Sequence, residues 1–336
     1  MKKLCLITTF MFSCLTLIAG AFGWGQRVHP CIGFLATPRD GYYLNANNGP
    51  DICHFIIPRD ALYAHSEIGF ANEMVAVAGS SPPSVREKMM QLAYGWGSHI
   101  KADEIAHTYM LPPEKFDTIE HGLVEIAIDW WLWNNGSGDE QNISKEASVV
   151  WSSWLIYETS IQYGKTPISL WKADLAGTIL AVVIAGETVL MISPGFYDQA
   201  MAYSDDTRSV LEDEAWRSYY DGAIDNVKKW LVSQRALGAP PAKVVRKTEP
   251  DNVKYTLLKD IGERAIRLGG IQTTMSSDSY FSRINIKVKD RNLCQKALRE
   301  VLSEKLKTAT GSEKEFALVL SGVRKSSVKM GEIKSK

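Results

Sequence analysis

The sequence predicts an all-α domain that is followed by a small mixed extension. Apolar residues recur at three- and four-residue spacing through most of the chain, which is the periodicity of amphipathic helices. Stretches rich in Pro, Gly, Ser and Asn separate these segments and supply the turn residues at which helices end. Helices are expected in the ranges 85–107, 118–133, 146–162, 170–192 and 209–236. The breaks are expected at 79–84, 111–115, 134–142 and 237–243.

One apolar run within these helices, at 175–193, is almost long enough to cross a bilayer. Glu187 interrupts it with a charge, and Gly177 and Gly186 dilute its apolar character. A buried core helix is therefore the preferred interpretation, with a membrane span as the alternative.

The break at 237–243, "LGAPPAK", is the best candidate for a domain edge. Beyond it, residues 279–289 alternate apolar and polar side chains as a strand does, and a charged helix is expected from about 290 to 308. A chain of 336 residues can bury a substantial core. The expected division is a helical domain at 24–240 and a C-terminal extension of unknown role at 245–336.

The charges of the whole chain balance, with 38 basic and 38 acidic residues. The chain as a whole therefore has no general attraction to nucleic acid or to anionic lipid. The balance is local, because residues 283–336 contain 14 Lys and Arg against 6 Asp and Glu. A solvated surface is the simplest explanation of this basic tail, and contact with anionic lipid headgroups is the alternative.

The first 23 residues have the features of a secretory signal. Lys2 and Lys3 form a positive start, an apolar stretch follows, and Ala21-Phe22-Gly23 offers small residues to a signal peptidase. Cleavage after Gly23 would start the mature chain at Trp24. The protein is therefore expected to be exported, to the periplasm or out of the cell.

Export would also permit disulfide bonds. The mature chain would keep three cysteines, Cys31, Cys53 and Cys294. A bridge between Cys31 and Cys53 is compatible with the sequence and would leave Cys294 as a free thiol.

The histidines are confined to one part of the chain. Histidines with unrelated structural roles would usually be scattered, so this confinement favours a shared task. Acidic residues lie near them: Asp51 is fourteen residues before His65, Asp103 is four after His99, and Glu125 is four after His121. The six histidines are His29, His54, His65, His99, His107 and His121.

The segment "GWGSHIKADEIAHTY", at 95–109, places His99, Asp103 and His107 at intervals of four. Residues four apart share a helix face, so a histidine and an acid at this spacing can hold one ion from one side. The three residues span roughly 12 Å along a helix, which is too far for one metal, but Asp103 has two oxygens and can bridge neighbouring metals. A solvated helix face is the alternative for any single pair. Imidazole nitrogen with carboxylate oxygen suits zinc, so the stripe predicts a multinuclear zinc site.

Two further residues near these ligands have open interpretations. His54 adjoins Asp51 and can support a ligand, although a hydrogen-bonded structural histidine is the preferred interpretation. Asp129 continues the stripe of His121 and Glu125 and can support a ligand imidazole, or it is a plain surface acid.

Nine residues in this order resemble the zinc-dependent phospholipase C family, which includes the amino-terminal domain of glycosylphosphatidylinositol-specific phospholipase D. The single-strand zinc nucleases are more distantly similar, and the short gap between Trp24 and His29 resembles theirs. The resemblance covers about residues 24–130 and implies an all-α bundle around a cleft that holds three zinc ions. The nine residues are Trp24, His29, Asp51, His65, His99, Asp103, His107, His121 and Glu125.

The resemblance also implies which residues share each zinc ion. One ion would take His29, Asp103 and the free amino group and carbonyl of Trp24, which requires cleavage just before that residue. The second would take Asp51, His65, His99 and the shared Asp103. The third would take His107, His121 and Glu125.

The function implied is phosphoester hydrolysis in which a metal-bound hydroxide attacks phosphorus, with Asp51 as the catalytic residue that orients or deprotonates the water. The expected substrate is a phospholipid or another phosphodiester, with peripheral membrane contact as an option. A single-strand nuclease or nucleotidase with the same zinc ions is one alternative, although nucleic acid is the less favoured partner because the basic residues gather in the tail. A metal-stabilised binding protein without catalysis is the other.

Overall fold

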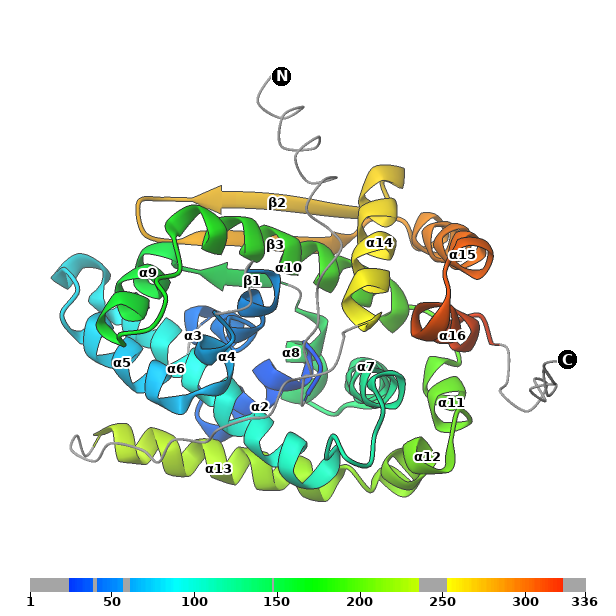
Figure 1. Ribbon diagram of the computed structural model, residues 1–336, viewed down its shortest axis with the longest axis horizontal. Helices are drawn as coiled ribbons and strands as arrows, with labels where there is room; N and C mark the ends of the chain where they lie inside the picture. Colours follow the sequence, from blue (N-terminus) through cyan, green and yellow to red (C-terminus); the bar gives the residue numbers. More distant parts are fainter. Residues whose placement is uncertain (1–23, 39–40, 57–60, 147, 236–252, 323–336) are drawn as a thin grey trace, which may run out of the picture.

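The computed structural model is mainly helical with one small three-stranded sheet, as the sequence predicts (Figure 1). The proposed signal and the proposed domain edge lie outside the described residues. The described residues are 24–38, 41–56, 61–146, 148–235 and 253–322. The elements are α2 (Val28–Ala36), α3 (Gly41–Ala46), η1 (Pro50–Phe55), α4 (Tyr63–Ser66), α5 (Ile68–Gly79), α6 (Pro83–Ile105), η3 (Ala106–Met110), α7 (Thr118–Asn135), α8 (Asp139–Lys145), β1 (Ser148–Trp151), α9 (Ser153–Gln162), α10 (Leu170–Met191), α11 (Phe196–Met201), α12 (Asp205–Leu211), η4 (Glu212–Glu214), α13 (Arg217–Arg235), α14 (Val253–Leu268), β2 (Ile271–Ser277), β3 (Ser282–Val288), α15 (Arg291–Thr308) and α16 (Gly311–Leu320).

The helix that carries the histidine stripe, α6, starts at Pro83, within the predicted proline break, and changes form near its end. A π turn, η3, continues it, and the amide of Leu111 donates to the carbonyl of Ala106 at 2.7 Å. A π turn is wider than an α turn and often marks a functional site. His107 lies in this turn, so the stripe does not continue as one regular α-helix.

Helix α7 begins with a capping box, as its sequence "DTIE" allows. The carboxylate of Asp117 accepts hydrogen bonds from the amides of Ile119 and Glu120, both at 2.8 Å. The side chain of Glu120 accepts in return from the amide of Asp117 at 3.2 Å. This cap fixes the first turn of the helix, just before His121.

Two of the predicted helices are wrong in part. The range 146–162 begins as the strand β1, because Val149 and Val150 pair with β3 and are buried. The range 209–236 is divided between α12 and α13. Between these two helices, Asp213 has a φ angle of 53° and Glu214 one of 55°. This left-handed conformation ends a helix.

The sheet has the order β1–β3–β2, and both pairs are antiparallel. The predicted strand at 279–289 is confirmed as β3, with Ile284 and Ile286 buried and Asn285 and Lys287 exposed. Its neighbour β2 was not predicted, because six of its seven residues are exposed and it has no apolar alternation. A turn in which Asp278 accepts two backbone amides joins β2 to β3.

The apolar run at 175–193 lies in α10, which is long and apolar enough to span a membrane. Most of this helix is buried inside the fold, so a core helix is the better interpretation. Helix α14 crosses it at close range through two glycines. A Cβ atom at Gly186 would lie 1.7 Å from the carbonyl oxygen of Leu258, and one at Gly262 would lie 2.0 Å from that of Val182.

The C-terminal segment therefore packs into the helical domain rather than beside it. Strand β3 pairs with β1 from the helical domain, in the register Val149 to Ile284. Helix α14 lies against α10 (Figure 1). Its first turn reaches the buried ligand residues described below.

The bridge between Cys31 and Cys53 that the sequence allows does not form, because Cys31, Cys53 and Cys294 are all free and buried thiols. Cys31 points toward α8, where its Sγ donates to the carbonyl of Glu140 at 3.4 Å. Cys53 is enclosed in η1. Burial raises the pKa of both thiols, so both stay protonated near neutral pH.

Candidate metal centre

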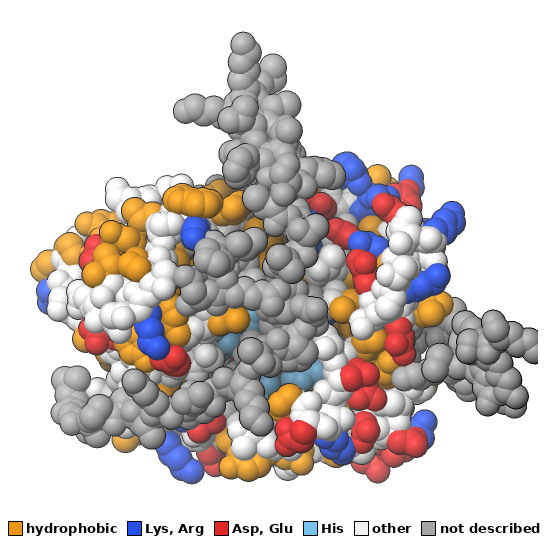
Figure 2. Space-filling view, in the orientation of Figure 1, with side chains coloured by type: hydrophobic (Ala, Val, Ile, Leu, Met, Phe, Trp, Pro, Cys, Tyr) orange, Lys and Arg blue, Asp and Glu red, His pale blue; other side chains and the backbone are white. Residues whose placement is uncertain are grey.

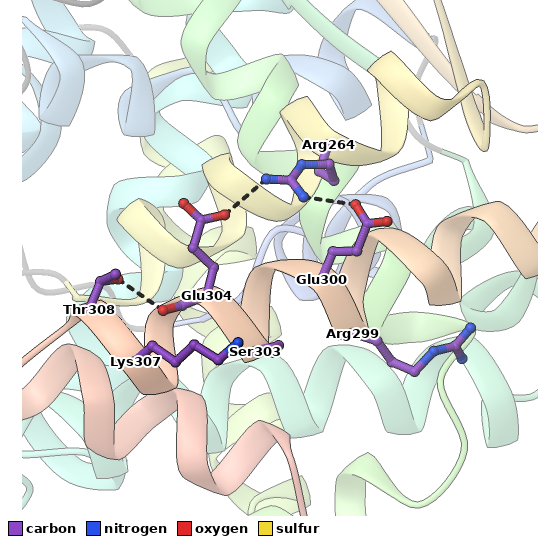
Figure 3. Close-up of a pocket in the computed structure, with 7 residues that line it drawn as sticks. All are labelled: Arg264, Arg299, Glu300, Ser303, Glu304, Lys307 and Thr308. Atoms are coloured by element: carbon purple, nitrogen blue, oxygen red, sulfur yellow. Dashed lines mark hydrogen bonds and ion pairs between the residues drawn. The ribbon is translucent and has the colours of Figure 1, made fainter.

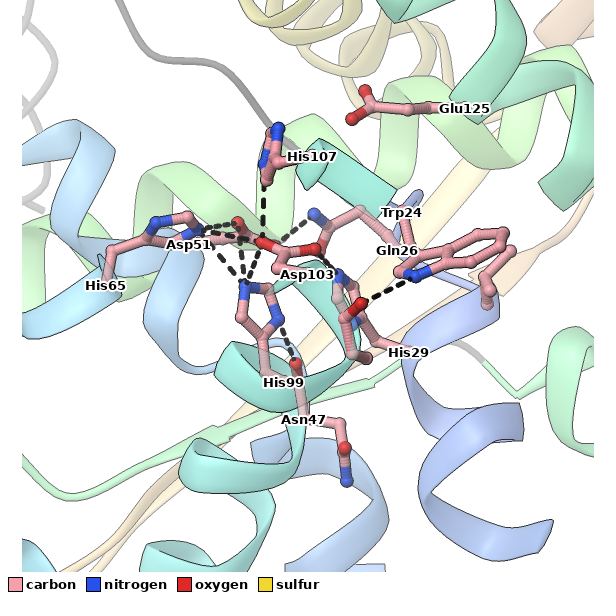
Figure 4. A network of polar contacts seen from close by, with 12 residues as sticks. Trp24, Gln26, His29, Asn47, Asp51, His65, His99, Asp103, His107 and Glu125 are labelled. Atoms are coloured by element: carbon pink, nitrogen blue, oxygen red, sulfur yellow. Dashed lines mark hydrogen bonds and ion pairs between the residues drawn. The ribbon is translucent and has the colours of Figure 1, made fainter. Parts of the chain in front are cut away.

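Four separate elements bring predicted ligands together around Asp103 (Figure 4). His99 and Asp103 come from α6, His29 from α2, Asp51 from η1 and His65 from α4. Each of these side chains is at most 1% exposed. Five polar side chains thus converge inside the core, which is costly unless charges and hydrogen bonds, or a bound ion, compensate them.

Four of these residues have the spacing of a single coordination sphere. Asp103 Oδ2 lies 3.3 Å from His99 Nε2 and 3.5 Å from His65 Nε2. Asp51 Oδ1 lies 3.4 Å from His65 Nε2 and 3.8 Å from His99 Nε2, and the two imidazole nitrogens are 3.1 Å apart. Ligands that sit about 2.0–2.2 Å from a tetrahedral zinc ion are roughly 3.3–3.6 Å from one another. We call Asp51, His65, His99 and Asp103 the four-ligand cluster.

The second oxygen of Asp103 faces another histidine. Its Oδ1 lies 3.3 Å from His29 Nε2, and the ring of His29 stacks on that of His99 with centroids 3.7 Å apart. Ligand atoms of His29, His99 and Asp103 all lie within 4.8 Å of one another, and so do those of Asp51, His54 and His65. The two oxygens of Asp103 therefore face imidazole nitrogens of different histidines.

Trp24, the first described residue, is fully buried beside this group. Its indole nitrogen donates to the carbonyl of Ala102 at 3.0 Å. The start of the described chain therefore lies against the turn of α6 that carries Asp103.

The remaining predicted ligands, His107, His121 and Glu125, form a looser group next to the four-ligand cluster. His107 Nε2 is 3.8 Å from Asp103 Oδ2, and its ring centroid is 5.2 Å from that of His121. His121 Nε2 is 3.1 Å from Glu125 Oε1. The other oxygen of Glu125 accepts a hydrogen bond from the ammonium of Lys254, at the start of α14.

This second group faces the solvent more than the first. The side chains of His107 and His121 are 11% and 7% exposed, whereas those of the four-ligand cluster are at most 1% exposed. Histidine side chains are visible near the centre of the face in Figure 2. Of the histidines in the two groups, His107 and His121 are therefore the most exposed to solvent.

Asp129 supports the N-terminal segment rather than a ligand imidazole. Its Oδ1 accepts hydrogen bonds from the backbone amides of Arg27 at 3.0 Å and Val28 at 2.8 Å. A Cβ atom at position 25 would lie 2.0 Å from its Oδ2, so a glycine is needed there. Asp129 thereby fixes the backbone between Trp24 and His29.

Polar groups behind the ligands hold their orientation. The side-chain amide of Gln26 donates to Asp51 Oδ2 and also to the hydroxyl oxygen of Tyr255, at 3.4 Å. The backbone carbonyl of Asn47 is 2.7 Å from His99 Nδ1, so that nitrogen carries the proton and Nε2 is left as the ligand atom. Such outer contacts fix the tautomer and direction of metal ligands.

The charges of the four-ligand cluster support one another. Burial alone would raise the pKa of Asp103, but the adjacent His99 and His29 outweigh it and hold this pKa well below its usual value. Burial alone would lower the pKa of His99, but Asp103 and Asp51 raise it above the ordinary value. Asp103 is therefore ionised, which is the form that binds a cation.

The residues present fit a bound cation. Several buried atoms of the group have no hydrogen-bonding partner among the described residues: both oxygens of Asp103, Oδ1 of Asp51 and both ring nitrogens of His29. Buried ionised oxygens without donors are costly, and a metal ion would satisfy them. The structure thus contains buried groups that could hold a metal ion.

A pocket on the outer side of the molecule, between α14 and α15, is unrelated to this centre (Figure 3). Arg264 bonds Glu300 at 2.8 Å and Glu304 at 3.0 Å within it. The charges of these three residues are therefore paired with each other. None of the predicted ligands lines it.

Comparison of the chain with protein families, with curated proteins and with solved structures finds no match. The resemblance to zinc-dependent phospholipases therefore depends on the nine residues themselves. Of these, the structure gathers His29, Asp51, His65, His99 and Asp103 most tightly.

Sequence reasoning did not include Lys254 or Gln26. Lys254 is 129 residues from Glu125 and beyond the proposed domain edge, so no local spacing links the two. Gln26 lies between Trp24 and His29. Its polar side chain next to two predicted ligands was the one feature of the sequence that could have indicated its role.

Proposed function

We propose that the protein is an exported zinc-dependent phosphoester hydrolase, of the phospholipase C-like phosphodiesterase kind. The observation that carries this proposal is the four-ligand cluster, in which five nitrogen and oxygen separations are between 3.1 and 3.8 Å. Nitrogen and oxygen ligands in such a sphere suit zinc. Up to three zinc ions are expected. The sets that contain Asp103, one with His29 and one with Asp51, His65 and His99, support a bound ion most strongly.

Zinc bound here would lower the pKa of a coordinated water and neutralise the charge of a phosphate group. Asp103 would share its two oxygens between neighbouring ions. Asp51 is the proposed catalytic residue: burial alone would raise its pKa, but His99 and His65 hold it below the ordinary value. An ionised Asp51, oriented by Gln26, would accept a hydrogen bond from the attacking water and align it.

The role proposed for Trp24 depends on signal cleavage just before it. Its complete burial and the hold of Asp129 on the following backbone both support a fixed start of the mature chain. A free amino group there would add a nitrogen ligand next to His29 and Asp103. Amino-terminal sequencing of the exported protein tests the cleavage.

The experiment that tests the function uses purified mature protein, with its zinc measured by mass spectrometry. Hydrolysis is followed on phosphatidylcholine vesicles, on single-stranded DNA and on bis(p-nitrophenyl) phosphate. A chelator should abolish the hydrolysis and added zinc should restore it. Turnover of DNA in place of lipid would favour the nuclease alternative, and zinc binding without any turnover would favour the structural one.

A further inference from the structure

The third predicted set of metal ligands differs from the other two because a lysine already lies in it. Lys254 comes from the first turn of α14, and its ammonium bonds Glu125 Oε2. Its side chain is 2% exposed and that of Glu125 is 1% exposed. The single carboxylate of this set is therefore neutralised by a buried cation of the chain itself.

The Lys254 side chain is closely packed by its neighbours. Helix α7 places Gly122 against it, and a Cβ atom at Gly122 would lie 3.2 Å from Lys254 Cβ. The Lys254 ammonium also lies 4.9 Å from the ring centroid of Tyr255.

The charge count separates this set from the four-ligand cluster. The cluster contains two carboxylates, Asp51 and Asp103, and within the described part of the chain no lysine or arginine forms an ion pair with either of them. The third set contains one carboxylate and one ammonium. A divalent ion bound by Glu125 would meet the ammonium of Lys254 at close range, and like charges repel strongly in a buried site.

We propose that Lys254 takes the place of the third metal ion, so that the centre holds two zinc ions and one lysine ammonium. This inference depends on the proposed zinc hydrolase. It makes the C-terminal segment a part of the metal centre and not an accessory to it. Lys254 would supply, as a point charge, the positive charge that a third zinc ion supplies in the three-zinc scheme.

Zinc counts by mass spectrometry on the mature protein and three variants test the proposal, together with anomalous diffraction at the zinc edge. The wild type should hold two zinc ions. Glu125→Gln should still hold two, because Glu125 binds the lysine and not a metal. Lys254→Met should hold three, since Glu125 is then released. Lys259→Met, on the same helix with its partners at the surface, is the matched control and should hold two.

Three ions in the wild type, with one lost in Glu125→Gln, would overturn the role of Lys254 and leave the zinc hydrolase intact. A count that stays at two in folded Lys254→Met would overturn it as well. A wild type without zinc would overturn both proposals. If Lys254→Met does not fold, the wild-type anomalous map decides: a peak between His121 and Glu125 contradicts the proposal, and two peaks at Asp103 alone support it.

Discussion

Two pairs in this molecule have the same sequence spacing and opposite surroundings. His99 with Asp103 in α6, and His121 with Glu125 in α7, are each a histidine followed four residues later by an acid, and all four are buried. The first pair meets a second carboxylate and two further imidazoles, whereas the second pair meets Lys254. The four-residue spacing thus brings the two side chains of a pair together. Residues distant in the sequence determine the charge of their surroundings.

The largest expected effect is on the first pair. Asp103→Ala should remove ligands of two proposed ions and lower the rate of phosphodiester hydrolysis on the order of 10³-fold or more, since a buried charge at the reaction centre is lost. Zinc content and kcat/KM on bis(p-nitrophenyl) phosphate measure it.

The adjacent acid Glu104 is a matched control, because it lies on the same helix but faces Lys101 at the surface. Glu104→Ala should keep both zinc content and rate. Full zinc content and activity in Asp103→Ala would show that the first pair is not a metal site.

The second expected effect is that His99 and His121 titrate at different pH values in the zinc-free protein. Burial and then Lys254 lower the pKa of His121 to about 3, whereas Asp103 and Asp51, against burial, raise that of His99 above 6.5. His121 should therefore stay neutral in the folded state at pH values where His99 is protonated. Imidazole NMR resonances followed from pH 8 to pH 4 measure this, and two histidines that titrate together would contradict it.

The free energy of unfolding of the zinc-free protein should depend on pH in opposite directions through His121 and through His99. Below about pH 6.5 the unfolded chain protonates His121 and the folded chain does not until about pH 3, so this residue destabilises the zinc-free protein on acidification, by up to about 1.4 kcal/mol per pH unit. His29 and His54, lowered mainly by burial, act in the same direction. His99 contributes stability below pH 6.5 that is lost as the pH rises through its folded pKa. Urea unfolding in chelator, with His121→Asn as the comparison, should show a weaker loss on acidification in the variant.

The helices and the α6 stripe could be predicted because their determinants are local. Three- and four-residue periodicity identified α6, α7 and α10, and the four-residue spacing placed His99 beside Asp103. The π turn at His107 was not predicted, because the four-residue spacing of the stripe is that of a regular α-helix continued through η3. The strand β2 has no apolar alternation and gave no signal.

The candidate site was predictable in its residue types and only partly in its geometry. Asp51 and His65 join the cluster through folding of separate short elements, and the resemblance alone indicated that they would do so. Lys254 was beyond prediction, because its contact with Glu125 joins segments on opposite sides of the proposed domain edge. Long-range counter-charges leave no periodic trace in a sequence.

A smaller expected effect tests whether the four-ligand cluster around the first pair depends on outer contacts. Gln26→Leu removes the donor to Asp51 Oδ2 while keeping most of the side-chain volume. The loss of such a contact should weaken zinc affinity about 10–100-fold without unfolding the protein. Competition with a fluorescent zinc chelator measures the affinity. An unchanged affinity would mean that Asp51 is oriented by the backbone of η1 alone.

The smallest expected effect concerns the second pair. Asp117→Ala removes the cap of α7, which should cost about 1 kcal/mol of unfolding free energy because two amides lose their acceptor. His121 lies one turn from this cap, whereas His99 and Asp103 are on another helix. The variant should therefore increase amide hydrogen exchange around His121 and leave the four-ligand cluster and its zinc unchanged. Zinc lost in proportion to the fraying of α7 would show that the two pairs act as one site, and the comparison between them would no longer hold.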